Sequence, residues 1–195
     1  GTALWMLFAY LGNWILPPLA WVLVLIFWFV VMPLWLKNKW QAVDGWKALA
    51  VGWMLMLPFW FALQLLRPDT DAAVSLLAVM GLVWVADIFA YFSGKAYGKH
   101  KLAPAISPGK SWEGAMGGAV CVLIYIIIVR NAGWLAFDWS WLATLFFALV
   151  LTAVSVGGDL LESWFKRVAG VKDSSSLLPG HGGVFDRVDS LIAVL

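Results

Sequence analysis

Long apolar stretches alternate with short polar segments from the start of the chain to about residue 156. The apolar runs cover residues 3–16, 19–36, 48–66, 72–92, 115–129 and 140–156. A helix needs roughly 20 apolar residues to cross the hydrocarbon core of a bilayer, so runs of this kind predict membrane-spanning helices. The first run is shorter and ends at Pro17-Pro18, and a further helix is expected from Val184 onward. The pattern therefore predicts an all-α, polytopic transmembrane bundle of six to seven spans.

The composition agrees with a membrane protein. Of the 195 residues, 63% are hydrophobic and 12% are charged, whereas soluble domains carry about 25% charged residues. The mean hydropathy is +0.88, and we expect one transmembrane domain over residues 1–195. Because the chain starts at Gly1 and stops at Leu195 inside an apolar run, we expect it to be truncated at both ends. The single cysteine, Cys121, lies in an apolar run and is interpreted as a packing residue.

Positive charge is concentrated in alternate loops. Of the 13 Lys and Arg residues, 11 lie in segments 37–47, 93–114 and 157–187, and the intervening turns hold only Arg67 and Arg130. Cytoplasmic loops carry an excess of Lys and Arg, so we expect these three segments to face the cytoplasm together. The net charge of +2 is small, and no nucleic-acid partner is expected.

Segment 157–189 gathers an unusual share of the charged residues. It carries five of the 11 acidic residues, namely Asp159, Glu162, Asp173, Asp186 and Asp189. It also carries four cations and a histidine, namely Lys166, Arg167, Lys172, Arg187 and His181. Charged groups beside apolar spans are costly unless they are compensated. This concentration of charge therefore indicates a functional site.

An amphipathic helical pattern starts at Asp159, immediately after Gly157-Gly158. We expect a helix break at these glycines, where the backbone can admit a ligand next to Asp159. Glu162 and Lys166 are four residues apart, which fits either two site residues or a surface ion pair.

Asp186 and Asp189 are three residues apart at the start of the last predicted helix, so they share one face. Carboxylate oxygens are ligands for Mg²⁺, and we expect Asp159 to converge with this pair. A cap that favours acids through the helix dipole explains one of the three residues but not their convergence. The glycine-rich segment 179–183 leads into the same helix, and backbone N–H groups in such segments bind anions. A phosphate site is therefore expected beside the acids.

Two further features lie upstream. The turn 107–114 joins Ser107, Lys110 and a glutamate ahead of a helix, which fits either a phosphate-binding turn or an ordinary helix start. Asp87 lies in the predicted span 72–92, about one turn from its end, where an acid is costly. We expect Asp87 to face the polar cavity of the site, and a surface acid that reaches out of the membrane is the alternative. Acids for a metal together with bases for phosphates are what phosphoryl or nucleotidyl transfer needs.

Residues Ser163–Asp189 read S-W-F-K-R-V-A-G-V-K-D-S-S-S-L-L-P-G-H-G-G-V-F-D-R-V-D. Upstream, Ala86–Leu102 read A-D-I-F-A-Y-F-S-G-K-A-Y-G-K-H-K-L, and Ser107–Gly114 read S-P-G-K-S-W-E-G. These motifs resemble those of the phosphatidate cytidylyltransferase family, the CDP-diacylglycerol synthases. Ser111 stands where threonine is common, a change that keeps the hydroxyl. The likeness is close from Ala86 onward, whereas the earlier part of the chain matches only as apolar spans.

The resemblance implies transfer of the CMP moiety of CTP to phosphatidic acid, which gives CDP-diacylglycerol and pyrophosphate in phospholipid biosynthesis. It implies a Mg²⁺-dependent homodimer, with K⁺ considered as a second, monovalent cation. It also implies a multi-pass protein in the lipid bilayer of the bacterial inner (plasma) membrane, with the active site facing the cytoplasm. Segments 72–114 and 157–189 would carry this active site.

The same resemblance assigns roles to individual residues. Asp159 and Asp186 would be the metal-binding carboxylates, and both would be catalytic together with Lys172. The candidates for substrate binding are Ser107, Lys110, Glu162, Lys166, Arg167, Asp173, His181, Arg187 and Asp189, and Asp87 is a further candidate.

Three other functions compete with this one. A CTP-dependent lipid kinase, such as a polyprenol kinase, is the closest alternative, and it would release CDP rather than pyrophosphate. A transporter or channel predicts charged residues near mid-membrane in several spans, whereas only Asp87 qualifies here. A non-catalytic scaffold gives no reason for acids and bases to gather in one segment. The distribution of charge therefore favours an enzyme.

Overall fold

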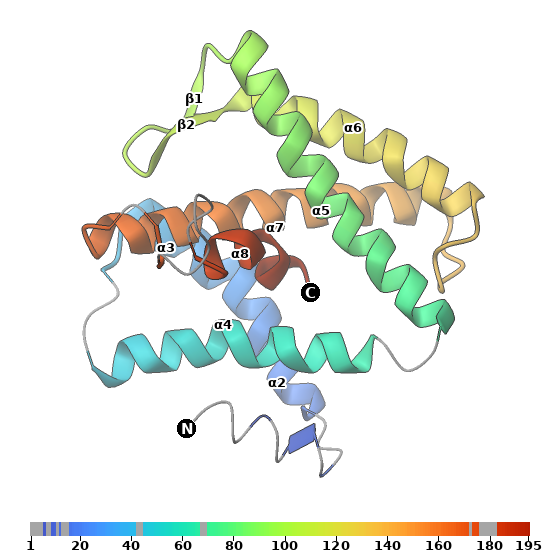
Figure 1. Cartoon of the computed structure of the whole chain (residues 1–195), viewed down its shortest axis with the longest axis horizontal. Helices are drawn as coiled ribbons and strands as arrows, with labels where there is room; N and C mark the ends of the chain where they lie inside the picture. The colour runs from blue at the N-terminus through green and yellow to red at the C-terminus, as the bar shows by residue number, and fades with distance from the viewer. Residues whose placement is uncertain are drawn as a thin grey trace.

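The computed structural model describes residues 16–41, 45–66, 70–171, 173–175 and 183–195, together with residues 6, 9, 10 and 12. Over these residues the chain is helical except for one small antiparallel hairpin (Figure 1). The elements are α2 (Pro18–Ile26), η1 (Phe27–Val31), α3 (Met32–Asn38), α4 (Trp46–Leu65), α5 (Thr70–Tyr97), β1 (Lys101–Ala103), β2 (Ser107–Ser111), α6 (Trp112–Asn131), α7 (Trp141–Val168) and α8 (Phe185–Val194). The prediction of an all-α fold is confirmed.

Within the described residues, five helices are long and apolar enough to cross a membrane. They are Pro18–Asn38, Trp46–Leu65, Ala73–Tyr97, Trp112–Asn131 and Trp141–Val168. Five of the apolar runs in the sequence correspond to these helices, and the run 3–16 lies largely outside the described residues. The last predicted helix is present as α8, whose ten residues are too few to cross a bilayer.

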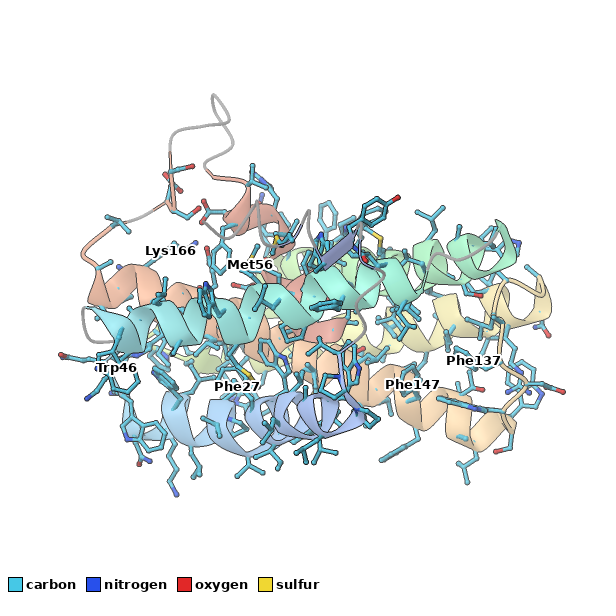
Figure 2. The ribbon with its side chains drawn as sticks, turned by 90° about the horizontal axis from the view of Figure 1, so that it is seen from below. Phe27, Trp46, Met56, Phe137, Phe147 and Lys166 are labelled. Atoms are coloured by element: carbon cyan, nitrogen blue, oxygen red, sulfur yellow. The ribbon has the colours of Figure 1, made fainter. Side chains whose placement is uncertain are left out.

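The outer faces of the long helices are covered by large apolar side chains (Figure 2). Leu19, Leu142 and Phe146 are among the many that are exposed. In water, apolar surface on this scale would promote aggregation, whereas lipid tails are an apolar solvent for it. The structure thus agrees with the composition in describing a multi-pass membrane protein.

Helix α7 does not break at Gly157-Gly158, so the predicted interruption is wrong. The helix continues without a gap to Val168. Both glycines are buried, and a Cβ at Gly157 would collide with Met32 of α3, while one at Gly158 would collide with Ala193 of α8. The two glycines therefore serve close helix packing rather than a local turn.

The segment 93–114, predicted to be a loop, is also more ordered than the sequence suggests. Helix α5 extends to Tyr97, β1 and β2 pair as a hairpin, and α6 begins at Trp112. Glu113, in the first turn of α6, accepts hydrogen bonds from the backbone N–H groups of Lys99 and His100, each at 3.2 Å. Its carboxylate also pairs with the imidazole of His100. These contacts fasten the base of the hairpin to α6.

Helix α7 lies at the centre of the arrangement, and α8 lies between α7 and α4 (Figure 1). One buried cluster joins α2–α3, α4, α7 and α8 around Leu161, and a second joins α5, α6 and α7 around Val122. Helices α3 and α7 end on the left in Figure 1, and the hairpin that follows α5 extends from the top toward the same side, whereas α5 and α7 begin on the right. Contacts of α7 with Trp40, and with Lys110 and Ile106 of the hairpin, join these regions. The three segments rich in Lys and Arg are thereby gathered at one end of the bundle.

Candidate active site

Three carboxylates from two helices meet at the end of the bundle that carries the basic segments. Asp159 and Glu162 are three residues apart on one face of α7, and Asp189 comes from α8. Each offers an oxygen, and these oxygens all lie within 4.8 Å of one another. The close approach of α8 to α7 depends on Gly158, where a Cβ would also lie 3.1 Å from the carbonyl oxygen of Asp189. The glycine therefore helps to bring the third carboxylate to the other two.

In the part of the chain that the structure describes, two lysines contact this carboxylate cluster of Asp159, Glu162 and Asp189. The Lys110 Nζ atom lies 2.5 Å from Oδ2 of Asp159, and Lys166 Nζ lies 2.7 Å from Oε2 of Glu162. Glu162 is 3% exposed, and Asp189 is partly buried. Acids in such surroundings are costly without compensation, and among the described residues two contacting lysines do not offset three carboxylates.

Asp186 lies at the edge of the carboxylate cluster and is joined to it through Lys166. Its Oδ1 atom accepts from Lys166 Nζ at 2.9 Å. Its Oδ2 atom accepts from the backbone N–H groups of Ser174, at 2.9 Å, and Gly183, at 2.7 Å, and from the Ser174 hydroxyl at 2.8 Å. Burial alone would raise the pKa of Asp186, but hydrogen bonds with Glu162, Lys166 and the two N–H groups hold it well below its usual range. Asp186 is therefore a fixed negative charge that holds the backbone of Ser174 and of Gly183.

The pKa of Asp189 is shifted in the opposite direction, upward. Burial raises its pKa to about 7, and the nearby negative charge of Asp159 adds to the effect, against a hydrogen bond from the N–H of Ser190. Crowding of like charges in a poorly solvated site has this effect on a carboxyl group.

A cavity of about 370 Å³, lined by charged, polar and apolar residues, adjoins the carboxylate cluster. It is bounded by α5, the hairpin, α6 and α7, and Asp159 belongs to both the cavity wall and the cluster. Ser107 and Lys110 line it from the hairpin, and Asp87 and Lys95 line it from α5. The structure thus places Asp87 in the wall of the cavity.

The other residues proposed from the sequence have varied positions. Arg167 is exposed, and its Nε atom donates to the carbonyl oxygen of Ile106 at the hairpin tip, at 3.3 Å. Arg187 on α8 and Asp173 are also exposed. Lys172 and His181 lie outside the described residues.

The cluster has the donor set that suits a hard divalent cation. Mg²⁺ prefers oxygen ligands and is commonly bound through carboxylates, and here three of them converge beside a cavity that carries lysines. The resemblance implies Asp159 and Asp186 as metal ligands, and the pattern of acids predicts that Asp159 converges with Asp186 and Asp189. In the structure Glu162 and Asp189 converge with Asp159, and Asp186 adjoins them through Lys166. The equal spacing of 159/162 and 186/189 is the signal that could have drawn attention to the second member of each pair.

Comparison with known proteins gives consistent matches. The phosphatidate cytidylyltransferase of Haemophilus influenzae is 53% identical over 122 residues, which cover 62% of this chain and 42% of the relative. The enzyme of the same name from Pseudomonas aeruginosa is 49% identical over 150 residues, 77% of this chain and 55% of the relative. That of Brucella abortus is 41% identical over 164 residues, 81% of this chain and 57% of the relative. The chain spans about half the length of the curated relatives it matches.

A family model matches residues 2–195, almost the whole chain, and its description is that of the cytidylyltransferase family. The carboxylate cluster, the basic side chains and the helical bundle are found within this matched region. The chain belongs to the cytidylyltransferase family.

Proposed function

We propose that the protein transfers the CMP moiety of CTP to phosphatidic acid, giving CDP-diacylglycerol and pyrophosphate. The observation that carries this proposal is the convergence of Asp159, Glu162 and Asp189 beside a cavity lined by Lys110. Acids that can hold a cation and cations that can hold phosphates are both needed when two anionic reactants must meet. The names of the relatives support the choice of reaction.

The expected cofactor is Mg²⁺, held by Asp159 together with Glu162 and Asp189 and with Asp186 at the edge of the cluster. When bound, it would neutralise negative charge on the nucleotide phosphates and on the leaving pyrophosphate. The combined negative charge of these carboxylates would also suit a second, monovalent cation such as K⁺. Asp186, ionised and strongly hydrogen-bonded, keeps Lys166 in place next to Glu162.

The protein side chains would position the two anionic substrates. Lys110 and Lys166 are the described cations closest to the acids, and Arg167 and Arg187 are exposed on the neighbouring helices. Lys172 and His181 remain candidates from the sequence. The lipid phosphate is already ionised, so its attack on the α-phosphorus needs no strong general base. A new P–O bond forms there, the α–β anhydride bond breaks, and pyrophosphate leaves with the electron pair.

The proposal also includes the membrane location, the orientation and the oligomeric state of the enzyme. Five candidate spans, apolar outer faces and bacterial relatives support a multi-pass protein of the bacterial inner membrane. The end of the bundle with the basic segments would face the cytoplasm, where CTP is available, while the lipid would arrive laterally from the bilayer. We also expect a homodimer, as the family resemblance implies.

The first test is release of pyrophosphate by detergent-purified protein supplied with CTP, phosphatidic acid and Mg²⁺. We expect release that depends on the lipid and is lost in Asp159→Asn and Asp186→Asn. Asp138→Asn is the matched control, because the Asp138 side chain is fully exposed near Arg130, far along the chain from the cluster. Lipid-dependent formation of CDP in place of pyrophosphate would replace this proposal with a lipid kinase.

A further inference from the structure

Lys110 occupies a position shared by the carboxylate cluster and the adjoining cavity. Its Nζ atom lies 2.5 Å from Asp159 Oδ2 and donates to the carbonyl oxygen of Val156 at 3.4 Å. The same side chain lines the 370 Å³ cavity next to Ser107. The ammonium group therefore holds one oxygen of a carboxylate that also belongs to the cluster suited to a cation.

Lys110 and Lys166 differ in how firmly they are held. Among the described residues, Lys166 forms ion pairs with two acids, Glu162 and Asp186, whereas Lys110 forms one, with Asp159. Because a lysine has a long flexible stem and a point charge, Lys110 can leave once this ion pair and its long hydrogen bond to Val156 are broken.

The hairpin that carries Lys110 is anchored independently of this ion pair. Its base is held to α6 through Glu113, which accepts from the N–H groups of Lys99 and His100. Its tip is held to α7 by the hydrogen bond from Arg167 to Ile106. The Lys110 side chain can therefore leave Asp159 while the backbone of the hairpin stays in place.

We propose that Lys110 is an exchangeable counter-ion of Asp159. In the metal-free protein it offsets the charge of a carboxylate that would otherwise be uncompensated. When a divalent cation binds to the carboxylate cluster, the lysine is displaced and its ammonium group becomes available to a phosphate in the cavity. Metal loading and phosphate binding are thereby coupled through one side chain. The second half of this proposal rests on the proposed function, and the first half rests on the contact geometry alone.

Metal affinity measured without substrate tests the exchange directly. Mn²⁺ is used as the probe, and its free concentration is followed by electron paramagnetic resonance in detergent-purified protein. Removing a competing charge should tighten Mn²⁺ binding by about tenfold in Lys110→Met, whereas Lys110→Arg, which keeps the charge, should stay near the wild type. Lys95→Met is the matched control, because Lys95 lines the same cavity and lies near Tyr91. Unchanged or weaker binding in Lys110→Met, or equal tightening in Lys95→Met, would overturn the exchange.

The turnover of the same variants separates this role from a purely structural one. We expect Lys110→Met to lose about 100-fold in turnover at saturating Mn²⁺, because the phosphate lacks its cation, even though the metal binds more tightly. A lysine that merely supports the fold would lower both quantities. If the wild type has no pyrophosphate-releasing activity but Lys110→Met still binds Mn²⁺ more tightly, the proposed function fails and the exchange stands. Activity in the wild type without the change in affinity would overturn the exchange and leave the proposed function in place.

A spin label tests the displacement with all charges intact, in case Lys110→Met does not fold. Gly109 precedes Lys110, and a Cβ there would meet open space, so Gly109→Cys can carry a nitroxide once Cys121 is replaced by serine. Addition of Mg²⁺ should change the spectrum of this label, because the displaced Lys110 side chain moves within the cavity that Gly109 also lines, and the effect should vanish in Asp159→Asn. A label that does not respond to Mg²⁺ would contradict the displacement of Lys110.

Discussion

The two ends of the helical bundle differ in the contacts that their charged side chains make. At one end, Arg130 donates to Thr144 Oγ1 at 2.7 Å and lies over the Trp141 ring, 4.2 Å from its centroid. A more distant contact, 3.8 Å, joins it to Asp138, whose side chain is fully exposed. Aromatic side chains surround this end, and Figure 2 shows Phe137 and Phe147 there, far from Trp46 and Lys166.

Counted over the described residues, the opposite end holds more carboxylates than its contacting lysines offset. Asp159, Glu162 and Asp189 converge, and Asp186 adjoins them through Lys166. At the Arg130 end, the guanidinium contacts a hydroxyl, a ring and a distant acid of the protein itself, which is typical of a structural anchor. An unbalanced group of acids is instead typical of a site completed by a ligand. Substitutions at each end can test this contrast.

The largest expected effect is on catalysis. Asp189→Asn should lower the rate of pyrophosphate release by about a thousandfold, because one of the three carboxylates proposed to hold Mg²⁺ beside the reacting phosphates is lost. Asp138→Asn at the other end should stay within about twofold of the wild type, as surface substitutions usually do. The rates are compared at matched concentrations of folded protein. Equal losses in the two variants would abolish the contrast between the ends.

The second effect concerns the glycine that lets α8 approach α7. Gly158→Ala should displace α8 and with it Asp189, because the added methyl group would collide with Ala193. We expect a loss of about 100-fold in turnover, because substitutions that remove the support of a metal ligand typically cost about 10- to 100-fold. Gly52→Ala is the control: Gly52 lies inside α4 with open space at its Cβ position, so alanine should stabilise the helix by about 0.5–1 kcal/mol.

Pyrophosphate release and thermal unfolding are measured for both glycine variants. A fully active Gly158→Ala would show that the packing of α8 on α7 does not determine the position of Asp189.

The third effect is on stability alone. Arg130→Met removes the hydrogen bond to Thr144, which is buried, and the contact with Trp141. Loss of a hydrogen bond from a charged group should lower the free energy of unfolding by about 1.5–3 kcal/mol, with turnover unchanged. Thermal unfolding and initial rates of the purified variant measure the two quantities. A loss of turnover without a loss of stability would place Arg130 in the function instead.

The helices and their charge pattern could be predicted from the sequence because lipid imposes strong local rules. A span must be apolar along its length, so the runs at 115–129 and 140–156 are evident without any knowledge of packing. The alternation of basic loops is likewise a local property, and it anticipated that segments 93–114 and 157–187 would lie at the same end.

The errors concern features that depend on partners distant in the sequence. Gly157-Gly158 was expected to break a helix, but the need for glycine arises from Met32 and Ala193 on other helices. The hairpin has no apolar alternation to reveal it, and its position depends on contacts with Glu113.

The membership of the carboxylate cluster also depends on contacts between residues that are distant in the sequence. Asp186 and Asp189 are both acids on one short helix, and only the angle at which α8 meets α7 determines which one joins Asp159. That angle is a tertiary property, whereas the presence of an acidic site in this segment was visible from composition alone.

The smallest expected effect is a pH dependence of stability in the metal-free protein. The pKa of Asp189 is raised by burial to about 7, whereas an unfolded aspartate ionises near ~3.9. The folded state therefore binds this proton more tightly, and its stabilising contribution is complete below about pH 4 and lost by about pH 7. The pKa of Asp186 is lowered, so its own contribution is complete above its ordinary range and does not vary between pH 5 and pH 8. In the presence of EDTA, the wild type should lose a few degrees of thermal stability between these two pH values relative to Asp189→Asn, and Mg²⁺ should restore it at pH 8. If the two proteins change equally between pH 5 and pH 8, Asp189 does not carry an excess charge that a cation relieves, and the contrast between the two ends of the bundle loses its electrostatic basis.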